Sequence, residues 1–136
     1  MKLAISKTNI LGYVTTSEPN LDNVCENAQC TEIFADGVLD LIPVMHLQNV
    51  LAHWKTKLRH SGRLIVGGTD IVELAKAIVT KRVNIPTTNI LLFGEKQDKT
   101  SIYTLDDIVH ILQSLDLKIT RKCLQGFKFL IEARRE

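Results

Sequence analysis

Residues that could do chemistry gather in three short stretches of the sequence. Asp36 and Asp40 follow an apolar run, Ser6, Lys7 and Thr8 follow another, and Gly67 to Asp70 separates an apolar run from an amphipathic one. Two carboxylates can act as general acid and base if they share a pocket, although Asp40 could instead cap a helix or face solvent. A glycine pair before a helix can bind an anion or simply form a turn. No Gly-Lys-Ser/Thr follows, so this is not a P-loop.

Histidines and cysteines do not predict a metal site. His46, His53 and His60 are seven residues apart, so on one helix they would share a face. Seven residues rise about 10.5 Å, however, and the ligands of zinc converge within about 2 Å of one ion. We therefore expect a solvated histidine stripe. Cys25, Cys30 and Cys123 lack the spacing of a zinc site, and we expect free thiols.

Apolar periodicity predicts an alternation of strands and helices. Helices are expected over residues 44–58 and 104–114, and between them a helix whose apolar face runs from Ile71 to Val79. Thr104 to Asp107 predicts a capping box at the start of the last helix. Thr69 or Asp70 is expected to cap the middle helix. A short helix capped by Asn20 or Asp22 is expected through Glu26. The expected strands span residues 2–5, 12–16, 31–35, 63–67, 90–94, 118–124 and 128–133, the last two forming a hairpin around Gln125-Gly126.

This order predicts one domain, residues 1–136, of the α/β class. We expect an open, mostly parallel sheet with a C-terminal antiparallel hairpin and helices on both faces. Ligands of such sheets bind beyond the carboxyl ends of the strands. At that edge the sequence places Ser6, Lys7, Thr8, Thr16, Ser17, Ala35, Asp36 and Thr69.

Composition limits the classes of partner. The chain has 136 residues, 45% hydrophobic and 24% charged, with a formal net charge of +2. This charge is too small to predict binding to nucleic acid or a membrane surface, and basic residues near the carboxyl end are expected to form a solvated edge. No apolar run is long enough for a signal peptide or a membrane span, so we expect a cytoplasmic protein.

The order of elements and several motifs resemble small class I S-adenosylmethionine-dependent methyltransferases. Residues 35–40 are similar to that family's post-strand motif, and residues 58–64 stand where a Lys-Pro-Gly-Gly-Arg-Leu turn is common. The resemblance implies that residues 3–8 are the counterpart of the glycine-rich cofactor loop. Every loop glycine is replaced there, and Thr16 stands where an acid bonds the ribose hydroxyls. Glycine lets the backbone approach the cofactor closely, so this loop is degenerate.

The resemblance therefore implies a methyltransferase-like protein that has lost catalysis, binds no cofactor and acts as a protein-binding or structural component, with a protein partner or a second copy. The alternative is an active methyltransferase that binds S-adenosylmethionine through an atypical loop. Ser6, Lys7, Thr8, Thr16 and Asp36 would then contact the cofactor, and Asp36 or Asp40 would be the base. A third hypothesis is a nucleotide- or anion-binding module that uses Lys7 and the turn at 67–70.

Overall fold

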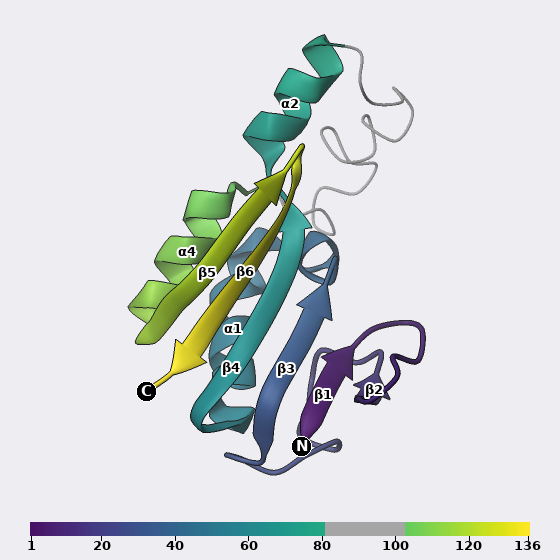
Figure 1. Ribbon diagram of the computed structural model, residues 1–136, viewed down its shortest axis with the longest axis vertical. Coiled ribbons are helices and arrows are strands. Elements are labelled where there is room, and N and C mark those ends of the chain that lie inside the picture. Colours follow the sequence, from purple (N-terminus) through teal and green to yellow (C-terminus); the bar gives the residue numbers. More distant parts are fainter. Residues whose placement is uncertain (81–102) are drawn as a thin grey trace.

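A computed structural model of the chain describes residues 1–80 and 103–136. Its sheet has the strand order β2-β1-β3-β4-β6-β5. Strands β1 (Lys2–Ile5), β2 (Val14–Thr16), β3 (Cys30–Asp36) and β4 (Leu58–Thr69) are parallel, whereas β5 (Leu117–Gln125) and β6 (Lys128–Arg135) form an antiparallel hairpin that joins β4 through β6. The predicted α/β sheet with its C-terminal hairpin is confirmed (Figure 1).

The helices are α1 (Leu47–Lys57), α2 (Ile71–Val79) and α4 (Leu105–Ser114), with short 3₁₀ turns η1 (Leu39–Leu41) and η2 (Val44–His46) before α1. Thr104 and Asp107 form the expected capping box of α4. Asp70 caps α2, since one carboxylate oxygen accepts from the backbone N–H groups of Val72 and Glu73. None of the described helices is long and apolar enough to cross a membrane.

One hydrophobic core lies between the sheet and the two helices α1 and α4. Its sheet side consists of alternate residues that meet in register, such as Ile33 with Leu64 and Ala35 with Val66. Its helical side includes Leu51 and Trp54 of α1, together with Ile108 and Leu112 of α4. The alternation arises because successive side chains of a strand point to opposite faces.

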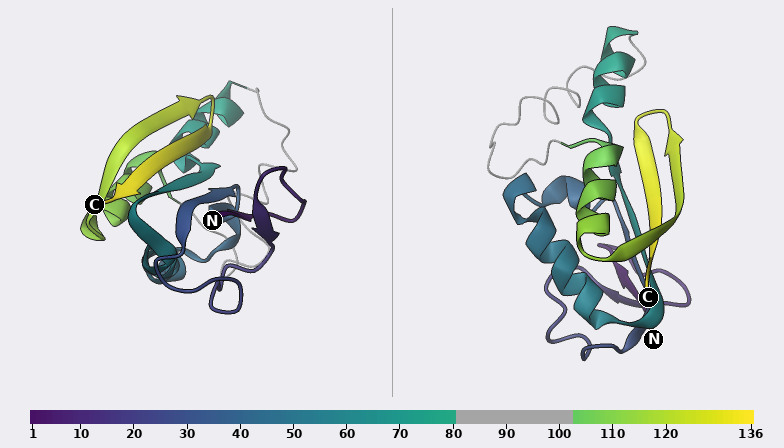
Figure 2. Two further views of the ribbon diagram at one scale, coloured as in Figure 1. Left: turned by 60° about the horizontal axis from the view of Figure 1, so that its bottom comes forward. Right: turned by 90° about the vertical axis from the view of Figure 1, so that its left-hand side faces the viewer.

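Both α1 and α4 cover the same face of the sheet, as the side view shows (Figure 2). In the described part of the chain, the helices of the core lie on this one face, whereas helices were expected on both. The connection from β1 to β2 spans only residues 6–13, and that from β2 to β3 spans residues 17–29; both consist of turns and irregular chain. A parallel crossover usually takes a dozen or more residues with a helix, and the first of these connections is too short for one.

Two local predictions were wrong. The stretch after Asn20 forms turns instead of a short helix, because the Asn20 side chain accepts a hydrogen bond from the Asp22 N–H at 3.0 Å, as in an Asx turn. Strand β4 also begins at Leu58, five positions before the predicted start at Arg63, and reaches Thr69. Its first residue already pairs with Cys30, and a bulge between Cys30 and Glu32 absorbs the shift of register. The predicted strand at 90–94 lies outside the described residues.

Candidate functional site

Three of the residues predicted at the cofactor edge lie together where β1 and β2 end. The Ser6 N–H donates to the Thr16 carbonyl at 2.8 Å. The Ser6 hydroxyl accepts from the Thr8 N–H at 3.2 Å and lies 3.4 Å from the Thr8 hydroxyl. Lys7 is exposed beside them. The hydroxyls therefore complete local turns, as is common for serine and threonine.

The chain after β1 lacks the geometry of a cofactor loop. Residues 6–13 return directly to β2 without a helix, and their one glycine, Gly12, lies at the far end of the connection with a φ of +87°. A loop that leads into a helix would direct several backbone N–H groups at a ligand. Here no such group of donors follows β1. The residues present do not fit the usual binding of S-adenosylmethionine.

Asp36 lies exposed at the carboxyl end of β3, in register with Gly67 of β4. A Cβ atom built on Gly67 would overlap the Asp36 carboxylate, so the missing side chain leaves room for it. The Gly37 N–H donates to the Gly67 carbonyl at 3.0 Å and fixes the turn that follows. Asp36 is thus a carboxylate held at the ligand edge of the sheet and open to solvent.

Asp40 neither caps a helix nor faces solvent, because it accepts a set of hydrogen bonds at the end of β4. Its Oδ1 atom accepts from the Thr69 N–H at 3.1 Å and the Tyr103 hydroxyl at 2.5 Å, and its Oδ2 atom accepts from the Thr69 hydroxyl at 3.0 Å. The Lys128 ammonium lies 3.8 Å from Oδ2. Burial, the charge of Asp40 and its hydrogen bond raise the pKa of Tyr103 far above the ordinary value of a tyrosine. These contacts favour a structural role for Asp40 over a catalytic pair with Asp36.

The turn at 67–70 is closed to an anion by its own side chains. The Val72 and Glu73 N–H groups at the start of α2 already donate to Asp70. The second carboxylate oxygen of Asp70 accepts from the Leu105 N–H at 2.8 Å and so joins the starts of α2 and α4. Gly68 leaves room for Tyr103, whose hydroxyl a Cβ atom would overlap. These contacts favour the structural role of the turn.

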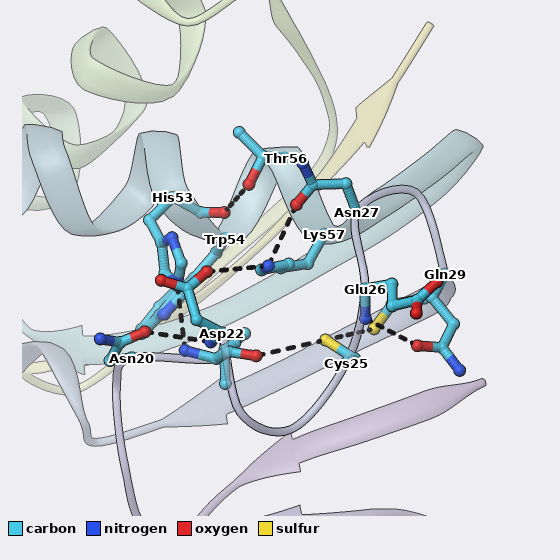
Figure 3. A network of polar contacts seen from close by, with 12 residues as sticks. Asn20, Asp22, Cys25, Glu26, Asn27, Gln29, His53, Trp54, Thr56 and Lys57 are labelled. Carbon is cyan, nitrogen blue, oxygen red and sulfur yellow. Dashed lines mark hydrogen bonds and ion pairs between the residues drawn. The ribbon is translucent and has the colours of Figure 1, made fainter.

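The loop between β2 and β3 is fastened to α1 by side-chain hydrogen bonds (Figure 3). The Trp54 indole N–H donates to the Pro19 carbonyl at 2.8 Å, and the Leu21 N–H donates to His53 Nε2 at 2.9 Å. The Lys57 ammonium lies 3.0 Å from both the Asp22 carboxylate and the Asn27 side-chain oxygen. The hydrogen bond from Lys57 lowers the pKa of Asp22 below its ordinary value. The expected histidine stripe is wrong, since His60 lies in β4 and His53 is bonded.

A hollow of about 440 Å³ opens between this loop and α1, lined by Glu18, Pro19, Asn20, Asp22, His46, Asn49, Val50 and His53. Its volume suits a small molecule. None of the predicted cofactor residues lines it, and the described residues contain no cluster of ligands for a metal ion. Sequence reasoning missed this hollow because its two walls are about thirty positions apart in the chain. Asn20, Asp22, His46 and His53 had been singled out only as helix caps and a solvated stripe.

Two of the three free cysteines lie in the core beneath the same loop. Cys25 and Cys30 are buried, and their sulfur atoms are 3.7 Å apart. Burial, together with the hydrogen bond to Cys25, raises the pKa of the Cys30 thiol to about 12. A thiol that stays protonated is a poor nucleophile, so the arrangement favours packing over chemistry.

Comparison with known proteins shows which proteins share this fold. No family model matches the chain. Magnesium protoporphyrin IX methyltransferase from Synechocystis, solved with bound S-adenosylhomocysteine, is 18% identical with a TM-score of 0.59, over 91% of this chain and 51% of that one. A SAM-dependent methyltransferase from Methanosarcina mazei is 12% identical with a TM-score of 0.63, over 90% of this chain and 66% of that one.

Among curated proteins, the PCNA-interacting partner of Bos taurus is 25% identical over 120 residues, which are 88% of this chain and 19% of that protein. A SAM-dependent methyltransferase from Aquifex aeolicus is 13% identical with a TM-score of 0.56, over 91% of this chain and 54% of that one. The chain therefore spans about half the length of this structure and about a fifth of the curated relative. Its strand order, its C-terminal hairpin and these likenesses together show that the chain has the fold of class I S-adenosylmethionine-dependent methyltransferases.

Proposed function

We propose that this chain is a single methyltransferase-like domain, residues 1–136, that no longer transfers methyl groups and acts by binding a protein partner or as a structural component. The observation that carries the proposal is the connection from β1 to β2. Residues 6–13 replace both the glycine loop and its helix by a short return, in which the Ser6 and Thr8 hydroxyls are engaged with each other and with the backbone.

The carboxylates support the same proposal. Asp40 is held by Thr69 and Tyr103, so a base at that position would first have to break several hydrogen bonds. Thr16 offers a hydroxyl where the family has an acid, and that hydroxyl accepts from the Glu18 N–H at 3.2 Å. A neutral hydroxyl also lacks the stronger charge-assisted bond of a carboxylate.

A role in protein binding is supported by the likeness to a protein whose name describes it as an interaction partner of PCNA. This chain is 25% identical to that protein over less than a fifth of its length, so the likeness does not assign PCNA as the partner of this chain. We propose a protein partner by class only. A cytoplasmic location stays a prediction.

The second candidate is an active methyltransferase, which the exposed carboxylate of Asp36 favours. Asp36 lies at the carboxyl edge with Ser6, Thr8 and Thr16, and Lys7 is exposed beside them. These five residues would hold S-adenosylmethionine if the loop opened, and Asp36 would then be the available base.

Calorimetric titration with S-adenosylmethionine and S-adenosylhomocysteine tests the proposal, with ATP as the control. The proposal predicts no heat of binding up to about 1 mM of any of the three ligands. Binding of the first two alone, at micromolar concentration, would establish the active enzyme instead. Equal binding of ATP would favour the nucleotide-binding module.

A further inference from the structure

The face of the sheet opposite α1 and α4 carries no helix among the described residues, and Figure 1 looks directly onto it. In register across this face lie Glu32 and Arg63, then Phe34, Ile65 and Glu132. The face therefore combines charged and apolar side chains, whereas the opposite face of β3 and β4 presents Ile33, Ala35, Leu64 and Val66 to the core. We call it the open face.

Three cations lie side by side on the open face. Arg63 of β4 is in register with Arg134 of β6, which is in register with Lys118 of β5. We call these three residues the basic row. Like charges directly opposite one another in a sheet are destabilising. The register of three cations is therefore not one that cross-strand pairing alone favours, and departures from local rules of this kind occur at functional sites.

The carboxylates nearby leave the basic row partly uncompensated. Arg63 lies 2.5 Å from Glu32 and 3.3 Å from Glu132 and is thus paired. Lys118 lies 3.6 Å from Glu136, but both side chains are about two-thirds exposed, so solvent screens this pair. Arg134 is exposed and makes no ion pair with another described residue. Arg121, in register with Glu132, adds a further exposed cation.

Apolar side chains lie further along the open face, toward the carboxyl end of β4. Leu130 is 39% exposed, and Phe34 and Ile65 are half-buried. Helices on both faces of the sheet would cover such residues, but the connections at 6–13 and 17–29 contain no helix. A partner that covers these residues gains apolar burial as well as ion pairs.

We propose that the basic row docks a helix of a protein partner that carries Asp or Glu along one side. The proposal rests on the protein-binding function proposed above and gives it a surface and a chemistry. Neighbouring strands are about 4.8 Å apart, so the three cations span roughly 10 Å. Carboxylates at positions i, i+4 and i+7 of a helix lie at about 0, 6 and 10.5 Å along its axis, which matches this spacing.

Two other occupants fit less well. A second copy related by two-fold symmetry would bring the same surface against itself, and the two basic rows would repel each other. Nucleic acid fits less well because, in the described part of the chain, Phe34 on this face packs against Tyr13 with ring centroids 6.1 Å apart, and neither ring is free to stack on bases.

The test measures fluorescence anisotropy of a labelled 15-residue helical peptide with Glu at i, i+4 and i+7 and Leu beside them. We expect binding that weakens with salt and becomes at least tenfold weaker in the double variant Arg134→Glu, Lys118→Glu. The control is Lys122→Glu, which reverses one charge in β5 on the opposite face, against two in the double variant, and should alter the affinity less than twofold. Arg134→Gln, with a smaller loss, keeps the test valid if the double variant unfolds.

The proposal is overturned if the peptide does not bind, if Lys122→Glu weakens binding as much as the double variant, or if a dT15 oligonucleotide binds more tightly than the peptide. Dimerisation that the double variant abolishes would assign the face to a second copy. The two proposals are tested by different experiments. Calorimetric binding of S-adenosylmethionine would overturn the proposed function whether or not the peptide binds.

Discussion

Replacing Gly68 with alanine should lower the melting temperature strongly, whereas the same change at the neighbouring Gly67 should not. A Cβ atom on Gly68 would overlap the Tyr103 hydroxyl and approach the Phe129 ring to 3.0 Å. Tyr103 is 2% exposed, packs edge-on against Phe129, and donates to Asp40 at 2.5 Å. It cannot move aside without disturbing both contacts.

The magnitude follows from these contacts. Overpacking a core usually costs about 1–3 kcal/mol, and losing a hydrogen bond to a charged group costs about 1.5–3 kcal/mol. If Tyr103 moves, the overpacking is relieved but the hydrogen bond to Asp40 is lost. We therefore expect Gly68→Ala to lower the free energy of unfolding by about 3 kcal/mol in total. For a domain of this size, that corresponds to a fall of about 10 °C in Tm.

Gly67→Ala is the matched control. Its Cβ atom would meet the carboxylate of Asp36, which is exposed and can rotate into solvent. We expect a loss below about 1 kcal/mol. Thermal unfolding followed by circular dichroism measures both variants. A Tm for Gly68→Ala within 2 °C of wild type, or equal losses at the two positions, would refute the packing described at the end of β4.

Three further predictions concern Asp40, the two tyrosines and the cysteines. Asp40→Ala should lose about 3 kcal/mol in urea unfolding, because the Tyr103 hydroxyl and the Thr69 N–H are left without their acceptor; a loss below about 1 kcal/mol would contradict this. The chain has two tyrosines. Hydrogen bonding to Glu32 raises the pKa of Tyr13, and burial, together with the charge of Asp40 and its hydrogen bond, raises the pKa of Tyr103. Both pKa values are higher in the folded state, so the stabilisation is full below about pH 10 and is lost as the pH rises above it; the phenolate absorbance of buried Tyr103 should appear only with alkaline unfolding. Iodoacetamide at pH 8 should label exposed Cys123 in the folded protein, while Cys30, with a pKa of about 12, and buried Cys25 should react only after unfolding, as mass spectrometry would show.

Local patterns in the sequence predicted the elements that build the core. The alternation of Ile33 with Ala35 and of Leu64 with Val66 identified two parallel strands, and Thr104 with Asp107 identified the start of α4. These signals lie within one turn or one strand, so they can be read without knowing the fold. The antiparallel hairpin was predicted for the same reason.

Contacts between distant segments could not be predicted in this way. Asp40 and Tyr103 are 63 positions apart, and nothing near Asp40 indicates that a tyrosine hydroxyl completes its surroundings. Leu21 and His53 are 32 positions apart, so the hollow beside α1 was not foreseen. The open face arises because the connections at 6–13 and 17–29 contain no crossover helix. Apolar periodicity predicts the helices that are present and does not show that a crossover helix is missing.

The central claim is that this methyltransferase fold does not bind S-adenosylmethionine, and the most direct test is an ¹H–¹⁵N correlation spectrum titrated with S-adenosylhomocysteine. The amides of Ser6, Thr16 and Gly37 lie at the ends of β1, β2 and β3 and report on the predicted cofactor edge. We predict that these signals stay unchanged up to about 1 mM ligand. Saturable shifts of all three at micromolar concentration would contradict the account.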